Sequence, residues 1–249
     1  MGRMILPLLA GAAAAVTAGY NSMAPRSQLY GRTFIGERRP SRRLALTFDD
    51  GPNDPHTLHL LDVLARQNVH ATFFMIGSFV EQRPEIARAV AAAGHAVGNH
   101  THTHPNLIFH HGSVVRRELQ DCERALDNAG VVRAGLFRPP HGGRTPIVLR
   151  TARNLGLEPI MWSVTAWDWK PHSSEKIVRL VRRQVFGGDV ILLHDGGHVR
   201  VGADRSASVR AAELIIQRYV GEGYEFVTIP EMMQAKQENQ PRILADQHR

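Results

Sequence analysis

The stretch LALTFDDGP, residues 44–52, constrains the fold more than any other segment of the chain. Its first five residues favour a buried β-strand, and Gly51 and Pro52 then turn the chain. Neighbouring side chains of a strand point to opposite faces, but at a frayed strand end before a glycine turn Asp49 and Asp50 can both face one cleft. Two adjacent carboxylates repel, so a buried pair needs a cation, a proton or an arginine beside it. On its own, the doublet is equally compatible with a turn or capping role.

Strand-like and helix-like segments alternate through the rest of the chain, which is typical of a parallel sheet. Beyond residues 44–48, the sequence predicts strands at 71–76, 95–99, 136–138, 159–164, 189–193 and 225–228. Helical spacing predicts helices between them, the first with Asp54 as its capping residue and Pro55 at its first position. Seven strands in 249 residues indicate one α/β domain, a barrel or nearly closed barrel.

The chemically unusual residues fall at the ends of the predicted strands. At or just after the carboxyl ends lie Asp49, Asp50, His100, Arg138, Asp168 and His194. That rim is where α/β barrels carry their chemistry, so we expect these side chains to share one site.

The segment His100-Thr-His-Thr-His104 offers a histidine pair for a metal ion. On one helical turn, His100 and His104 would face the same side and His102 would point away. Two imidazoles and one carboxylate suit Zn²⁺ and other divalent first-row metals. Because surface histidines are common, the segment indicates a metal site chiefly in combination with the aspartate pair.

The remaining rim residues are candidates for proton transfer. A carboxylate that does not bind the metal can take the proton of an attacking water. Arg138 could hold that base ionised through a bidentate pair, or it could form an ordinary structural salt bridge. His194 could protonate a leaving amine if Asp168 keeps it charged, or it could be a structural histidine.

The chain ends differ in character from its middle. Residues 4–20 resemble a secretory signal or membrane anchor, with a short basic start, an apolar middle and small residues near 16–18. Several arginines follow, and positive flanks prefer the cytoplasm, which argues against export. Residues 21–41 are predicted to be a linker or an extended lead-in to the first strand, and residues 234–249 a polar tail.

Composition limits the partners. The net charge of +7 is interpreted as a solvated basic surface, with attraction to an anionic envelope as the alternative. No arginine-rich helix with interleaved aromatics is present, so nucleic acid is not predicted as a partner, nor is an obligate protein partner. Cys122 is the single cysteine, so no internal disulfide can form, and its apolar spacing predicts a core thiol.

Five motifs, in order, resemble those of the polysaccharide deacetylases, which are carbohydrate esterase family 4 and carry the NodB homology domain. They are TFDDGP at 47–52, HTHTH at 100–104, RPPHG at 138–142, WSVTAWDW at 162–169 and ILLHD at 191–195. The resemblance covers residues 42–233 and implies a distorted, partly open (β/α)7 barrel as the catalytic domain.

The resemblance also implies roles for individual residues. Metal-dependent removal of an acetyl group from a sugar would use Asp49 as the base toward a metal-bound water. The metal ligands would be Asp50, His100 and His104. Arg138 would position the base, His194 would be the catalytic acid, and Asp168 would tune that acid.

Substrate contacts follow by the same resemblance. The backbone N–H near His141 would help to hold the oxyanion, Leu192 would line the acetyl-methyl pocket, and Trp169 would lie in the groove. Two positions depart from the family pattern. Thr165 stands where the fourth motif usually has an aspartate, and His141 stands where an aromatic such as tyrosine is common.

The leading hypothesis is an enzyme that removes N-acetyl groups from peptidoglycan, chitin oligomers or an exopolysaccharide. The cofactor would be a divalent metal, Zn²⁺ first, with Co²⁺ or Mn²⁺ as alternatives. It would be exported, or anchored to the cytoplasmic membrane facing a bacterial envelope, with residues 4–20 as the membrane contact. Alternatives are an O-acetyl xylan esterase, a deformylase of a lipid-linked amino sugar and an inactive glycan-binding domain.

Overall fold

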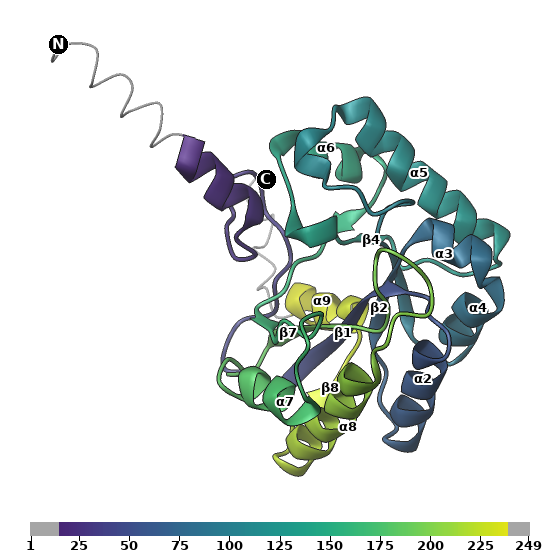
Figure 1. Ribbon diagram of the computed structural model, residues 1–249. Coiled ribbons are helices and arrows are strands. Elements are labelled where there is room, and N and C mark those ends of the chain that lie inside the picture. The colour runs from purple at the N-terminus through teal and green to yellow at the C-terminus, as the bar shows by residue number, and fades with distance from the viewer. Residues whose placement is uncertain (1–14, 239–249) are drawn as a thin grey trace, which may run out of the picture.

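The computed structural model describes residues 15–238, which form one curved parallel sheet surrounded by helices (Figure 1). The sheet order is β5-β4-β3-β2-β1-β7-β6, and β8 pairs with the start of β1. The strands are β1 (Arg43–Gly51), β2 (Thr72–Met75), β3 (Ala96–Asn99), β4 (Leu136–Phe137), β5 (Glu158–Pro159), β6 (Val164–Thr165), β7 (Asp189–His194) and β8 (Glu225–Phe226).

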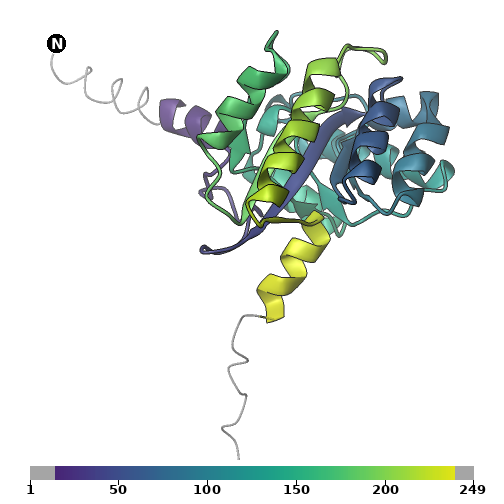
Figure 2. The ribbon, with the colours of Figure 1, turned by 90° about the horizontal axis from the view of Figure 1, so that it is seen from below.

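Helices between the strands cover the outer face of the sheet, as the turned view shows (Figure 2), and one more helix follows the last strand. They are α2 (His56–Arg66), α3 (Gly77–Gln82), α4 (Pro84–Ala92), α5 (Gly112–Asn128), α6 (Pro146–Asn154), α7 (Ser174–Arg182), α8 (Ser206–Gly221) and α9 (Ile229–Glu238), with short 3-10 turns at Leu107–Phe109 and Pro140–Gly142.

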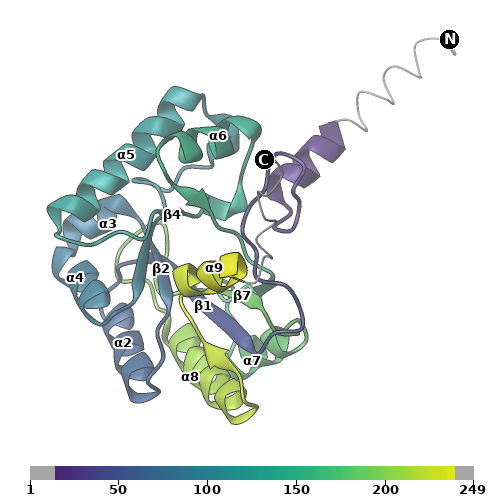
Figure 3. The same ribbon diagram turned by 180° about the vertical axis from the view of Figure 1, so that it is seen from behind.

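Alternation along β1 separates two apolar layers. Leu44, Leu46 and Phe48 pack outward in a cluster that contains residues of α2, α4 and α8. Ala45 points inward to a second cluster, which includes Met232 of α9. Seen from behind, α9 lies across the base of the barrel beside β1 (Figure 3). The inner face of β1 is therefore apolar near its start, and the aspartates stand at its carboxyl end.

The barrel is open between β5 and β6, as the resemblance implies, but the predicted strand 159–164 is not one strand. It is divided into β5 and β6 because the backbone between them leaves the ladder. Ile160 instead forms a parallel bridge with Phe34, and Gly36 forms an antiparallel bridge with Asp189. Residues 34–36 thus lie in the gap between the two edges of the sheet.

Residues 22–36, here called the strap, lie against the barrel rather than apart from it. The buried Arg144 donates through its backbone N–H to Ser22 O and through its guanidinium to the carbonyls of Ala24 and Ser27. Phe34 is only 6% exposed. Part of the segment expected as a linker or lead-in is therefore packed structure, a result that polar composition alone does not reveal.

Residues 15–23, which end inside the start of the strap, are helical. Residues 4–14 of the expected signal or anchor lie outside the described residues. Within residues 15–238, no helix combines the length and apolar character needed to cross a membrane.

Several local expectations are wrong in detail. The first helix begins at His56 with Pro55 as its N-cap, and no side chain caps it, so Asp54 lacks the predicted role. The predicted strand at 71–76 ends at Met75, and Gly77, whose backbone N–H donates to Thr101 O, already begins α3. The C-terminal helix α9 continues past residue 233 to Glu238. Cys122 is fully buried, which confirms the predicted core thiol.

Candidate active site

The two aspartates at the end of β1 face the same cavity because the strand is distorted between them. The pairing of β1 with β2 shifts register between Asp49 and Gly51, and Asp50 has a positive φ of 72°. Such a bulge re-aims a side chain that regular alternation would send to the opposite face. Asp49 and Asp50 both line a cavity of about 330 Å³. The expectation of a shared cleft is confirmed.

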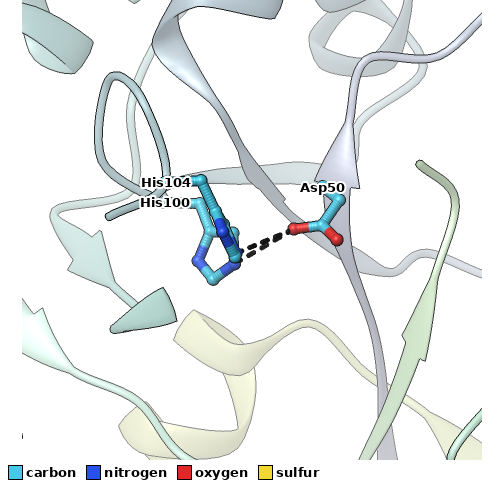
Figure 4. Close-up of side chains that lie close together, drawn as sticks. All are labelled: Asp50, His100 and His104. Carbon is cyan, nitrogen blue, oxygen red and sulfur yellow. Dashed lines mark ion pairs between the residues drawn. The ribbon is translucent and has the colours of Figure 1, made fainter. Parts of the chain in front are cut away.

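Asp50, His100 and His104 converge at the wall of this cavity (Figure 4). Oδ1 of Asp50 lies 3.4 Å from Nε2 of His100 and 3.2 Å from Nε2 of His104. This oxygen is buried and has no hydrogen-bond partner among the described residues. A buried carboxylate oxygen that faces two imidazole nitrogens fits a divalent cation, and the donor set suits Zn²⁺ and its first-row neighbours.

The histidines converge through an irregular loop and not through the expected helical turn. Thr101 and His104 both have positive φ, 67° and 59°. Oγ1 of Thr101 accepts the backbone N–H of His104 at 3.1 Å, which closes the turn. Glu118 of α5 accepts the N–H groups of His102 and Thr103, so the loop is held from outside. Side-chain hydrogen bonds therefore replace the helical ladder that the spacing suggested.

The tautomers and charges of the two histidines suit metal binding. Nδ1 of His100 lies 2.8 Å from the carbonyl of Arg138, which can only accept, so Nε2 is left free toward Asp50. Burial lowers the pKa of His104 to about 4, so this imidazole is neutral at pH 7. Burial by itself raises the pKa of Asp50, but the closeness of the His100 and His104 imidazoles holds it well below the usual value.

Asp49 is held by a fully buried arginine. Nη1 of Arg138 donates to Oδ1 of Asp49 at 2.7 Å and to Oγ1 of Thr47 at 2.8 Å. The guanidinium also lies over the Phe74 ring, 4.2 Å from its centroid. The pair is not bidentate as expected, because Nη1 is shared between the carboxylate and Thr47. The second oxygen of Asp49, Oδ2, lies 3.8 Å from Nε2 of His100.

His194 and Asp168 form the second buried ion pair of the site. Nδ1 of His194 lies 2.8 Å from Oδ1 of Asp168, while Oδ2 of Asp168 accepts the backbone N–H of His194 and the hydroxyl of Ser208. Burial lowers the pKa of His194, but the charge and hydrogen bond of Asp168 outweigh it and raise this pKa to about 9. His194 is therefore an imidazolium at pH 7.

The residues expected to contact substrate also line the cavity. Trp169 is 44% exposed, and its ring meets His194 edge-on with centroids 5.2 Å apart. His141 has a positive φ of 56° and meets the His104 ring edge-on at 4.7 Å. Leu192 is buried in the wall. Thr165 is not part of the lining, and its backbone instead exchanges hydrogen bonds with the Gln184 side chain.

Sequence reasoning missed three contributors. Ser208 supports Asp168, and His198 and Arg205 complete the lining, to which Trp162 of the fourth motif also belongs. The available signal for His198 was its place four residues after His194, behind two glycines that let the chain bend back toward the rim.

The chain is similar in sequence to known deacetylases. The sequence profile of the polysaccharide deacetylase family matches residues 36–160. A peptidoglycan-N-acetylglucosamine deacetylase of Bacillus cereus is 37% identical over 197 residues, covering 78% of this chain and 70% of the relative. A chitooligosaccharide deacetylase of Rhizobium leguminosarum bv. trifolii is 35% identical over 196 residues, covering 76% of this chain and 91% of that protein.

The fold is also similar to that of a solved deacetylase structure. The crystal structure of a peptidoglycan N-acetylglucosamine deacetylase bound to a naphthalenyl N-oxidanyl-benzamide superposes with a TM-score of 0.74 at 35% identity, covering 81% of this chain and 92% of that one. The matched profile, the open barrel and the cluster of Asp50, His100 and His104 are concordant. This chain belongs to the polysaccharide deacetylase family.

Proposed function

We propose that this enzyme removes N-acetyl groups from an N-acetylated glycan, with a divalent metal held by Asp50, His100 and His104. One observation carries the proposal. The unpartnered Oδ1 of Asp50 faces two imidazole nitrogens in the same cavity that receives Asp49 with its arginine and His194 with its aspartate. A hydrolase of amides needs a base for water and an acid for the amine, and this arrangement supplies both.

Zn²⁺ is the first choice of metal, and Co²⁺ and Mn²⁺ remain compatible with two imidazoles and one carboxylate. When bound, such an ion polarises the acetyl carbonyl and lowers the pKa of a coordinated water. The chain needs only to present neutral imidazoles and an ionised carboxylate, which is the state that burial of His104 and the contacts of Asp50 favour.

Asp49 is the proposed base. Arg138 occupies one of its oxygens at 2.7 Å, so the carboxylate is fixed in orientation while Oδ2 remains toward the ligand cluster. The proton of the attacking water passes to this carboxylate. Arg138 acts through Asp49 and is a positioning residue.

His194 is the proposed acid. Collapse of the tetrahedral intermediate expels the glucosamine nitrogen, which must gain a proton to leave as an amine. The imidazolium of His194 carries that proton, and Asp168 keeps it charged by binding Nδ1. The opposite ring nitrogen, Nε2, is the one that faces the leaving group.

The substrate is a glycan chain carrying N-acetylglucosamine. The relatives named above act on peptidoglycan N-acetylglucosamine and on chitooligosaccharide, which supports this class. Trp169 offers an exposed ring at the rim for a sugar face, and Leu192 offers an apolar surface for the acetyl methyl group. The backbone near His141 faces the same cavity and would help to hold the oxyanion.

An envelope location is part of the proposal. The apolar stretch at residues 4–20 supports it, as a signal or as an anchor, and so does a peptidoglycan-directed relative. Localisation of a tagged full-length chain by cell fractionation tests this, and a purely cytoplasmic distribution would contradict it.

The decisive experiment measures acetate release by the full chain, metal-stripped and then given Zn²⁺ or Co²⁺. N-acetylglucosamine oligomers, peptidoglycan and acetylated xylan serve as parallel substrates, and formate is assayed with a formylated amino sugar. Metal-dependent acetate from the first two supports the proposal. Acetate release from xylan alone would favour an O-acetyl esterase. Formate release without acetate release would favour a deformylase. One metal per chain with glycan binding and no turnover would favour a binding domain.

A further inference from the structure

One histidine of the cavity has no role in the proposed mechanism. His198 lies in the loop of residues 195–205, which connects β7 to α8. Its side chain is about half exposed, and it lines the cavity together with the candidate metal ligands.

The loop that carries His198 is tied down by a buried side chain. Nδ2 of Asn53 donates to the carbonyls of Asp195 and Ala203, both at 2.8 Å, and Oδ1 of Asn53 accepts the N–H of Gly202. Asn53 is fully buried, and it lies three residues after Asp50. One amide therefore fastens both ends of the loop to the strand that carries Asp49 and Asp50.

The start of the loop lies directly against the backbone of Asp50. A Cβ added to Gly196 would stand 1.9 Å from the Asp50 carbonyl oxygen, a contact that only glycine permits. Arg205 donates through Nε to Gly196 O at 2.6 Å and closes the loop on itself. Two residues later, the chain has turned far enough for the His198 ring to reach back over the cavity.

His198 meets two of the three candidate ligands. Its ring is nearly parallel to that of His104, with an interplanar angle of 22° and centroids 4.7 Å apart. Its Nδ1 lies 3.9 Å from Oδ2 of Asp50. That oxygen is not the one that faces His100 and His104, since those imidazoles lie closest to Oδ1. The two oxygens of Asp50 therefore face different partners.

We propose that His198 is a positioning residue for the metal. Its Nδ1–H engages Oδ2 of Asp50, through a small rotation of the exposed ring or through one water, and so reserves Oδ1 for the cation. Hydrogen-bond partners of this kind orient metal-ligating carboxylates, and their loss typically costs ten- to a hundredfold in metal affinity. The inference rests on the proposed metal site and assigns to that site a residue outside the five sequence motifs.

Stacking on His104 offers the competing explanation, in which only the ring matters. Two substitutions separate the possibilities. His198→Asn keeps an N–H donor near the position of Nδ1 and removes the ring, whereas His198→Phe keeps a ring over His104 and removes the donor. His110→Ala, at an exposed histidine outside the cavity lining, is the matched control.

The experiment measures the affinity of the full chain for Zn²⁺ by competition with a chromophoric chelator, and it records the visible spectrum of the Co²⁺ form. We expect His198→Phe to bind Zn²⁺ at least tenfold more weakly than the unchanged protein and to alter the Co²⁺ spectrum. His198→Asn and His110→Ala should stay within about threefold. Thermal unfolding of the metal-free variants should coincide, which excludes a folding defect.

Other results of the affinity comparison overturn the inference. Unchanged affinity in His198→Phe would show that the donor has no effect on the metal. Equal weakening in both His198 variants would assign the effect to the ring. Unchanged metal affinity with a raised KM would make His198 a sugar contact instead. If the unchanged protein binds one Zn²⁺ per chain without releasing acetate, the affinity comparison still stands and only the proposed function fails. If the unchanged protein binds no Zn²⁺ at all, both the role of His198 and the proposed function are overturned.

Discussion

Nη1 of Arg138 lies 2.7 Å from Oδ1 of Asp49, and both side chains are buried. Removing one partner of a buried ion pair leaves an uncompensated charge, which typically costs about 3–5 kcal/mol. We expect Arg138→Met to lower the free energy of unfolding of the metal-free chain by about 3 kcal/mol, as measured by urea denaturation. Deacetylation should fall by at least about a hundredfold, as expected when a general base loses its position.

A double variant provides the control for this pair. Asp49→Leu combined with Arg138→Met removes both charges, so the coupling between the two positions should return part of the lost stability. Strict additivity of the two single effects would show that the 2.7 Å contact contributes nothing.

Substitutions at Asp49 and at His100 should distinguish a loss of catalysis from a loss of metal binding. Asp49→Asn removes the proposed base without touching the ligand set, so it should keep one metal per chain and lose about 10²–10⁴-fold in rate. His100→Ala removes a ligand and should lose both. Metal content by elemental analysis and acetate release decide the matter, and a near-normal rate in Asp49→Asn would remove the base assignment.

The alkaline limit of activity should depend on Asp168. An acid catalyst works only below its pKa, and that of His194 is about 9, so kcat/KM should decline as the pH rises through 9. In Asp168→Asn the largest contribution that raises the pKa of His194 is gone, burial still lowers this pKa, and only the weaker charges of Asp50 and Asp49 still raise it. The limit should then move down toward about 6.5, the ordinary imidazole value.

Ser208→Ala is the milder companion variant, since it removes one of three hydrogen bonds to Asp168 and keeps the charge. Its alkaline limit should move by less than that of Asp168→Asn. Identical pH profiles for Asp168→Asn and the unchanged enzyme would contradict the assignment of His194 as the acid.

The strap should contribute to stability. Phe34 is 6% exposed and belongs to the inner cluster, so Phe34→Ala should cost about 3–5 kcal/mol by urea unfolding. Leu29, in the same segment, is 65% exposed, and Leu29→Ala should cost less than about 0.5 kcal/mol. Equal, small effects at both positions would mean that the segment behaves as a linker.

The sequence was most informative where local chemistry and strand ends coincide. Asp49 and Asp50 end an apolar strand, and a parallel sheet brings its carboxyl ends to one rim, so their meeting with His100 and His194 could be predicted. The geometry of the 100–104 turn could not be predicted. His104 reaches its position through a positive φ and a hydrogen bond to Thr101, whereas the i, i+4 spacing predicted the same pairing of His100 with His104 on a helical turn.

Long-range contacts account for most of what was missed. Phe34 bridges to Ile160, more than a hundred residues away, and nothing in the polar segment around it signals that partner. The same holds for His198, which is placed by Asn53 through hydrogen bonds that span about 150 residues. Local patterns carry no information on such pairs, because these pairs depend on how the whole sheet curves.

The strap also bears on how the protein could be shortened during maturation. Its hydrogen bonds to the barrel include three from Arg144, one from Arg26 to Ser163 O and two through the backbone of Phe34, and none of these uses a residue before Ser22. The small residues that resemble a cleavage site lie at 16–18. A protease acting there would release the apolar leader and leave every one of those bonds in place. Such processing is therefore compatible with a packed strap, and the new N-terminus would lie beside the open edge of the sheet.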